Sequence, residues 1–289
     1  SPVAVPNHAD AEGVGSHLPF SLSGRPRAGQ RIGPGRRCAT IVSVELGEYE
    51  LMYQIEQRYW WFLGRRGHAL RLLERWTHGA RGLDILDVGC GTGANLLAFR
   101  RFGAVTGCDI SPAAVAFCRK RGIADAVVQP EPDRLPFPDG RFDLITCLDV
   151  IEHVKDDVGM LREMCRVLKP GGAAFFTTPA FPALWSVHDE SLHHMRRYRR
   201  RELVDKFAAA GFAAERITYL NALLLPLIVP VRWLRDRLTR SKGATSDFNL
   251  GLHPALNALF LAAFSSEAAW LRFAPLPFGL SLCALARRD

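Results

Sequence analysis

Two kinds of apolar spacing alternate along the middle of the chain. Short runs of branched apolar residues predict buried strands, whereas apolar residues three or four positions apart predict helices packed over them. The expected strands are 83–87, 104–109, 126–129, 142–148, 173–178, 212–219 and 277–287, and the expected helices include 111–121, 157–168 and 200–210. Repeated strand–helix units of this length predict an α/β fold, a parallel, doubly wound sheet with helices on both faces and ligands at the carboxyl ends of the strands.

Two further helical segments are expected, one before this pattern and one within it. Residues 41–80 are expected to form an N-terminal helical cap, with two helices between Glu48 and Trp76 that are broken near Gly64. Residues 220–276 are expected to form a helical insertion before the last strand, broken by several prolines. Its apolar runs are interrupted by polar residues and prolines, so we expect no membrane span. It could form a hydrophobic lid, a dimer surface, a membrane-contacting patch or an extra packed layer.

Composition limits the domain organisation. The length of 289 residues and the apolar share of 48% suit one large domain with a sizeable core. This domain is expected at 41–289, with its core at 81–219 and 277–289. Residues 1–40 are rich in Pro, Gly, Ser and Arg and are expected to be a disordered tail. The seven cysteines are scattered without a C-x-x-C pair, and the start shows no signal peptide, which indicates free thiols and a cytoplasmic protein.

The formal net charge of +8 comes partly from residues 1–38 and partly from an arginine-rich run at 196–201. Such a local run is more typical of a solvated helix start than of a nucleic-acid surface. We therefore expect no nucleic-acid partner, while an anionic lipid or an anionic substrate remains open.

Alternate glycines follow the first expected strand, in the order Asp87-Val88-Gly89-Cys90-Gly91-Thr92-Gly93. Glycines permit positive φ and a close approach of a ligand, and the helix beyond offers free N–H groups. With Ala94, Gly89 and Gly91 also satisfy a permissive dinucleotide pattern, so an NAD(P)-dependent oxidoreductase is one alternative. Asp87 favours another ligand, because a carboxylate here can bind an ammonium group but would repel a pyrophosphate.

Acid-x-Gly-x-Gly-x-Gly resembles the opening motif of class I S-adenosylmethionine-dependent methyltransferases, and the resemblance extends over roughly residues 45–219 and the final strand. It implies a Rossmann-like seven-stranded sheet, S-adenosylmethionine as cofactor and S-adenosylhomocysteine as product. It also implies that Asp109 binds the ribose hydroxyls, that Glu131 or Asp133 reaches the adenine amino group, and that Arg65, rather than Arg66, meets the cofactor carboxylate. The cofactor-binding residues implied are Arg65, Asp87, Gly89, Gly91, Gly93, Asp109, Ile110, Glu131, Leu135 and Leu148.

Candidate catalytic residues follow the fourth and fifth expected strands. The segment 147–154 resembles the acid-x-x-Glu-His segment of quinone-biosynthesis O-methyltransferases. There His153 is a candidate general base. Alternatively, Asp149, Glu152 and His153 together could hold a divalent cation, although no metal is expected. In the third alternative these residues only stabilise the loop.

The segment 184–198 resembles one found in bacterial type 11/12 members of the family. It supplies His188 and His194 as further candidate bases. Its His, Asp and Arg residues could instead orient an oxygen nucleophile, bind an anion or tie down the loop. A base is dispensable where positioning alone brings nucleophile and methyl group together.

Taken together, these patterns predict methyl transfer from S-adenosylmethionine to an oxygen of a small, partly hydrophobic acceptor, such as a phenol or quinol, a carboxylate or a natural-product hydroxyl. The absence of Asn/Asp-Pro-Pro-aromatic after the fourth strand counts against methylation of DNA bases. The alternatives are an N- or C-methyltransferase, an NAD(P)-dependent oxidoreductase and a non-catalytic cofactor-binding partner protein. Peripheral membrane or homodimer contact through 220–276 is the partner hypothesis besides a small-molecule substrate.

Overall fold

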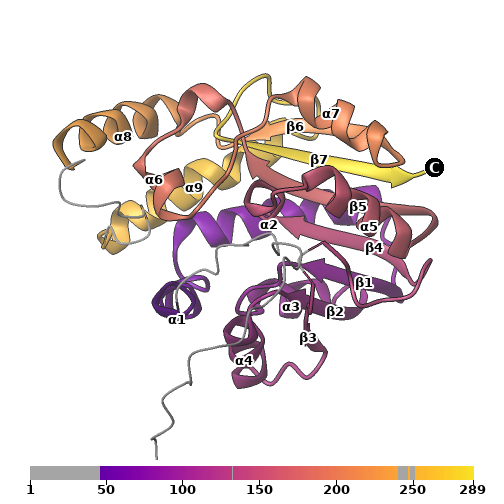
Figure 1. Cartoon of the computed structure of the whole chain (residues 1–289). Coiled ribbons are helices and arrows are strands. Elements are labelled where there is room, and N and C mark those ends of the chain that lie inside the picture. Colours follow the sequence, from indigo (N-terminus) through magenta and orange to yellow (C-terminus); the bar gives the residue numbers. More distant parts are fainter. Residues whose placement is uncertain (1–45, 132, 240–246, 248–250) are drawn as a thin grey trace, which may run out of the picture. The chain divides into compact units, whose positions relative to one another are not determined.

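A computed structural model describes residues 46–131, 133–239, 247 and 251–289, so the predictions for the tail at 1–40 lie outside the described residues (Figure 1). It contains a seven-stranded sheet in the order β3-β2-β1-β4-β5-β7-β6. The strands are β1 (Leu83–Val88), β2 (Gly103–Asp109), β3 (Ala126–Val128), β4 (Phe142–Leu148), β5 (Leu168–Pro179), β6 (Phe212–Leu220) and β7 (Ser281–Arg288). Strands β1 to β5 pair in parallel and β7 is antiparallel to both neighbours, which confirms the expected α/β fold.

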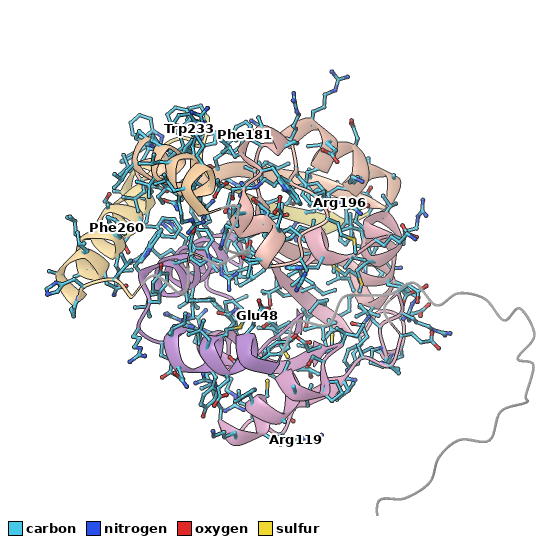
Figure 2. All side chains as sticks on the ribbon, turned by 60° about the vertical axis from the view of Figure 1, so that its left-hand side comes forward. Glu48, Arg119, Phe181, Arg196, Trp233 and Phe260 are labelled. Atoms are coloured by element: carbon cyan, nitrogen blue, oxygen red, sulfur yellow. The ribbon has the colours of Figure 1, made fainter. Side chains whose placement is uncertain are left out.

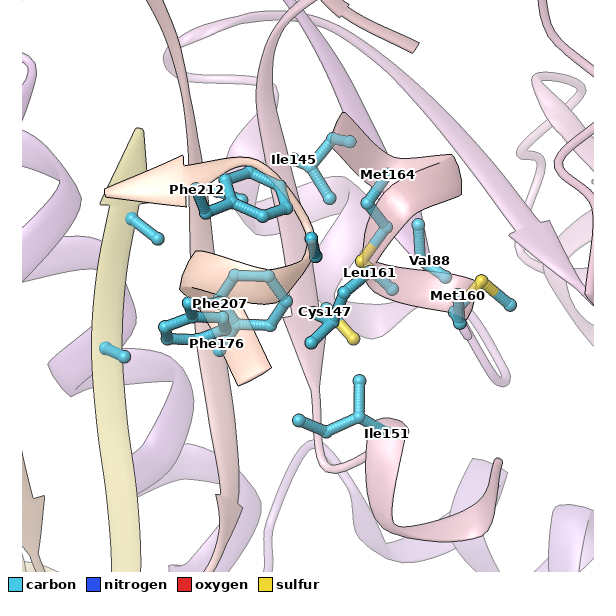
Figure 3. Packing of buried hydrophobic residues seen from close by; sticks show 14 of the residues in the cluster. Val88, Ile145, Cys147, Ile151, Met160, Leu161, Met164, Phe176, Phe207 and Phe212 are labelled. Carbon is cyan, nitrogen blue, oxygen red and sulfur yellow. The ribbon is translucent and has the colours of Figure 1, made fainter. Parts of the chain in front are cut away.

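Helices cover both faces of this sheet. Those described are α1 (Leu46–Ile55), α2 (Trp60–Trp76), α3 (Ala94–Phe99), α4 (Pro112–Lys120), α5 (Asp157–Val167), α6 (Val187–Ser191), α7 (Arg200–Ala209), α8 (Leu225–Thr239) and α9 (Pro254–Trp270), with 3₁₀ turns η1 (Ile151–His153) and η2 (Pro182–Leu184). Phe176 of β5 packs with Phe207 of α7 (Figure 3). Neighbouring strand residues point to opposite faces, so Phe175 packs on the α2 side with Trp76.

The ends of several elements differ from expectation. The predicted helix break near Gly64 is wrong: α2 runs through Gly64, and the break lies at 56–59. Gly64 is needed for packing instead, because a Cβ there would overlap the ring of Phe264 on α9. The fifth strand begins at Leu168, earlier than expected, because Leu168 pairs with Phe142 across an irregularity in register. The last strand begins only at Ser281, four residues later than expected, and Pro277 lacks the N–H that pairing at the expected first position requires.

The sheet places the insertion at its carboxyl edge. Both the end of β6, at Leu220, and the end of β5, at Pro179, pair with Ser281 at the start of β7. The chain therefore leaves β6 and returns to β7 at the edge where the parallel strands end. Helices α8 and α9 lie within this excursion, and none of the described helices is long and apolar enough to cross a membrane.

Candidate active site

A cavity of about 660 Å³ lies at the carboxyl edge of the sheet, within the range of small-molecule sites. Its wall is formed by the loop after β1, the ends of β2 and β4, helices α1 and α2, and the insertion. Two of its lining residues, Glu48 on α1 and Phe260 on α9, are labelled in Figure 2. The predicted site residues that line it are Arg65, Gly89, Gly91, Asp109, Ile110, Leu148, Asp149, His153, His188 and His194.

Asp109 is held by the backbone of the loops around it. The Gly91 N–H donates to one carboxylate oxygen and the Ser111 N–H to the other, each at 2.9 Å. The first bond depends on Gly91, whose φ of +53° is left-handed. A carboxylate oxygen can accept more than one hydrogen bond, so Asp109, at the cavity wall, retains capacity for two ligand hydroxyls. This fits the ribose role that the sequence implies.

Asp87 lies immediately behind the lining residues Val88 and Gly89 and is 1% exposed. Thr146 donates to its Oδ1 at 2.5 Å, while Oδ2 has no hydrogen-bond partner among the described residues. Burial raises the pKa of Asp87 to about 7. A buried carboxylate that lacks a donor, next to glycines at the cavity floor, fits a cofactor that brings a cationic group to this end.

Besides Asp87, three residues expected to bind the cofactor do not line the cavity. Gly93, with φ of +90°, serves packing, because a Cβ there would lie 2.8 Å from Ile123 Cδ1. Glu131 is exposed and Leu135 is 1% exposed within the core. The cavity is lined instead by Gln129, whose N–H donates to the Asp109 carbonyl at 2.8 Å. In the sequence, the position of Gln129 as a polar residue at the end of an expected strand could have indicated that it lines the cavity.

Arg65 reaches from α2 to the end of β4. Its Nη1 donates to the Leu148 carbonyl at 3.3 Å and to the Asp149 carboxylate. Thr177 also donates to Asp149, at 2.9 Å, and Asp149 has a left-handed φ of +57°. Arg65 therefore lines the cavity, but it also fixes the loop that carries His153.

The three candidate histidines meet at the other end of the cavity. The ring centroids of His153 and His194 are 4.8 Å apart, and those of His188 and His194 are 6.4 Å apart. Burial, reinforced by His194, lowers the pKa of His153 to about 3. Burial, reinforced by Arg232, likewise lowers the pKa of His188 to about 3. Both imidazoles are neutral and weakly basic near pH 7.

His194 has a carboxylate partner. Its Nδ1 lies 2.9 Å from Oδ1 of Asp189, which is fully buried. Arg197 donates to both oxygens of Asp189, at 2.7 and 2.9 Å. Burial alone would raise the pKa of Asp189, but the hydrogen bonds from His194 and Arg197 lower it well below its usual range. When the ionised Asp189 accepts from Nδ1–H, Nε2 is the ring nitrogen of His194 that is left to accept a proton from a ligand.

One potential cation site is present among the described residues. Ligand atoms of Glu152, His153 and His194 lie within 4.8 Å of one another. Burial raises the pKa of Glu152 well above its ordinary value, and Asp149 adds to the shift. The set differs from the one expected, because Asp149 is engaged by Arg65 and Thr177 and His194 takes its place.

Comparisons with known proteins show what the chain is similar to. Residues 86–176 match the family model described as Methyltransferase domain. A probable S-adenosylmethionine-dependent methyltransferase of Mycolicibacterium smegmatis is 33% identical over 58% of this chain and 65% of its own length. A ubiquinone biosynthesis O-methyltransferase of Xanthomonas oryzae is 39% identical over 34% of this chain and 43% of its own. The chain thus spans less than two thirds of either relative.

Solved structures support the fold. A chain from the complex between the Trm112 methyltransferase activator of Haloferax volcanii and a methyltransferase superposes with a TM-score of 0.54 at 20% identity, over 84% of this chain and 94% of that one. A structure described as a sarcosine dimethylglycine methyltransferase from Galdieria sulphuraria gives 0.51 at 19% identity, over 78% and 86%. Residues 86–176 thus match a methyltransferase domain, and the chain shares the fold of these solved structures.

Proposed function

We propose that this protein transfers a methyl group from S-adenosylmethionine to an oxygen atom of a small, partly hydrophobic acceptor. The observation that carries the proposal is that Asp109 and the histidine cluster line one continuous cavity. When bound, the cofactor supplies an electrophilic methyl group. Gly91, Asp109 and Leu148 would hold it at one end, with the buried carboxylate of Asp87 behind them.

The acceptor end combines apolar walls with the histidines. Trp60, Trp61 and Phe260 line the cavity opposite the sheet, and Leu192 lies near the histidine-bearing loop. The charged lining residues Arg232 and Arg235 are neutralised by ion pairs with Asp247, so the wall as a whole suits an acceptor that is itself largely apolar. This composition favours a phenol, a quinol or another amphiphilic hydroxyl compound over a highly charged one.

His194 is the proposed general base. A phenol or alcohol would give its proton to Nε2, and the ionised Asp189 would stabilise the imidazolium that forms. Asp189 is a positioning residue, because it acts on the acceptor only through His194. A pKa of about 3 makes His153 and His188 poorer bases, so we assign them to shaping the cavity. A carboxylate acceptor would need no base.

The test is methyl transfer to a panel of phenols, carboxylates and aliphatic alcohols, measured as the formation of S-adenosylhomocysteine. We expect a phenol or other hydroxyl acceptor to be methylated, and His194→Gln to lower kcat by about 10²- to 10⁴-fold with little change in cofactor affinity. Asp189→Asn should shift the pH profile of kcat. His193→Asn is the matched control, because His193 is adjacent but does not line the cavity.

Two outcomes would overturn parts of the proposal. Full activity of His194→Gln would remove its role as a base. Loss of activity in EDTA, restored by zinc or another transition-metal ion, would favour the cation alternative at Glu152, His153 and His194, because imidazole nitrogens suit such ions. Methylation of nitrogen or carbon acceptors only would replace the oxygen acceptor by one of the other classes.

The partner of the insertion is a further part of the proposal. Residues 220–276 contribute to the cavity wall and also present apolar side chains to the exterior. A peripheral contact with a membrane or with a second copy of the chain would cover them.

A further inference from the structure

Helix α8 exposes an apolar stripe. None of its described side chains, from 225 to 238, is buried, although about half of them are apolar. Leu227, Val231, Leu234 and Leu238 are spaced by four, three and four residues and therefore share one side of the helix, and each is about half exposed or more. Helices in water normally bury such a stripe, so α8 presents a surface that a partner can cover.

Helix α9 extends this apolar surface. Figures 1 and 2 both show α8 and α9 next to each other on the same side of the molecule. On α9, Leu259 and Trp270 are exposed, and Phe273 just beyond it is 88% exposed. The opposite side of α9 is used for packing, with Phe264 fully buried against α2. Both helices of the insertion therefore present apolar side chains outward.

The stripe is continuous with the cavity. Leu227 and Val231 belong to the exposed stripe and also line the cavity wall. These two leucine and valine side chains are therefore places where the outer apolar surface of α8 meets the cavity wall, next to the lining residues Arg232 and Arg235.

Among the described residues of α8, α9 and the turn after α9, the exposed charges have one sign. Arg237 on α8 and Arg272 after α9 are exposed. The acidic residues of the two helices are turned inward instead: Asp236 accepts from the Val187 N–H at 3.1 Å, and Glu267 is 2% exposed. The Arg237 guanidinium lies 3.7 Å from the centre of the Trp233 ring. Tryptophan and arginine next to apolar side chains are typical of surfaces that lie in the headgroup region of a membrane.

We propose that the exposed faces of α8 and α9 dock on a lipid surface with anionic headgroups, and that the acceptor is a membrane-resident amphiphile that enters between Leu227 and Val231. The second part rests on the proposed methyl transfer. A second copy of the chain fits less well, because a two-fold contact through this stripe would bring like-charged arginines together. Since neither helix can span a bilayer, the contact is peripheral.

The test is sedimentation of the full chain with vesicles of phosphatidylcholine alone or mixed with phosphatidylglycerol. The variant is Leu234→Glu/Leu238→Glu, because these residues are exposed and neither lines the cavity. Leu97→Glu on α3 is the matched control, with a comparable exposed leucine outside the insertion. We expect the wild type and the control to bind the mixed vesicles, more weakly at high salt, and the double variant to bind about tenfold or more weakly.

Cofactor titration and circular dichroism check that the double variant is folded. Absence of wild-type binding to mixed vesicles, or equal binding to both kinds, would overturn the proposed anionic surface. Concentration-dependent dimerisation that the double variant abolishes, without vesicle binding, would assign the stripe to a second copy. If vesicles bind but no oxygen acceptor is methylated, the docking surface stands and the proposed function fails.

Discussion

At the scale of single residues, the site depends on two buried carboxylates that the chain holds in different ways. Asp109 is fixed by two backbone N–H groups, and Asp189 by Arg197 and His194. The first faces the end expected to bind the cofactor, and the second supports a histidine at the acceptor end. Each can be tested by a substitution that changes one charge and little volume.

Asp109→Asn should weaken S-adenosylmethionine binding by about tenfold or more, because hydrogen bonds to a charged acceptor contribute roughly 1.5–3 kcal/mol each. Titration calorimetry measures the effect. Glu131→Gln is the control and should leave the affinity unchanged, since Glu131 is exposed and outside the cavity wall. The reverse result, a large effect at Glu131 and none at Asp109, would show that the adenosine lies elsewhere.

The difference between these two residues also shows where sequence was sufficient. Asp109 could be placed because a clear apolar run marks the end of its strand. Glu131 lies in a segment with several prolines, where the spacing of residues does not predict which way a side chain points. The structure places Gln129, rather than Glu131, in the cavity wall. The ion pair between Asp189 and Arg197 could be predicted only as one of several alternatives, because the sequence does not show which charged side chains of a loop pair with each other once they are buried.

At the scale of elements, the packing of α2 on α9 joins the cap to the insertion. Gly64 gives room to Phe264, and His68 Nε2 lies 2.8 Å from the Phe264 carbonyl. Sequence could not predict this joint, since almost 200 residues separate the two helices. The same contact explains why a glycine that reads as a helix break lies inside a continuous helix.

Gly64→Ala should lower the free energy of unfolding by about 1–3 kcal/mol, because the added methyl group overlaps the Phe264 ring and overpacks the joint. Gly67→Ala on the same helix is the matched control. Its Cβ would meet only the flexible end of Arg71 at 3.2 Å, so it should stabilise the protein by up to about 1 kcal/mol. Denaturant unfolding of both variants measures this, and equal effects would argue against the joint.

His68 makes the same joint sensitive to acid. Burial lowers its pKa to about 4, whereas in the unfolded chain it titrates near its ordinary value of about 6.5. Between these values only the unfolded chain binds the proton, so His68 reduces the free energy of unfolding by about 1.4 kcal/mol per pH unit as pH falls. The difference between wild type and His68→Gln should change by roughly 2 kcal/mol between pH 7 and 5. A constant difference would mean that His68 is hydrated in the folded protein.

At the scale of the whole molecule, the order of strands explains why one edge carries both the residues expected to bind the cofactor and those proposed to bind the acceptor. Parallel strands β1, β2 and β4 end there, and the insertion leaves and returns at the same edge. Apolar spacing was sufficient to predict the sheet and its seven strands. The path of α8 and α9 over the cavity was not predictable, because an apolar helix fits a buried layer, a lid or an exposed surface equally well in sequence.

The central claim is that this edge binds S-adenosylmethionine rather than a dinucleotide, and titration calorimetry of the full chain tests it directly. We predict that S-adenosylmethionine and S-adenosylhomocysteine each bind once per chain and compete with each other, while NADH gives no binding heat. Binding of NADH without binding of S-adenosylmethionine would contradict the account.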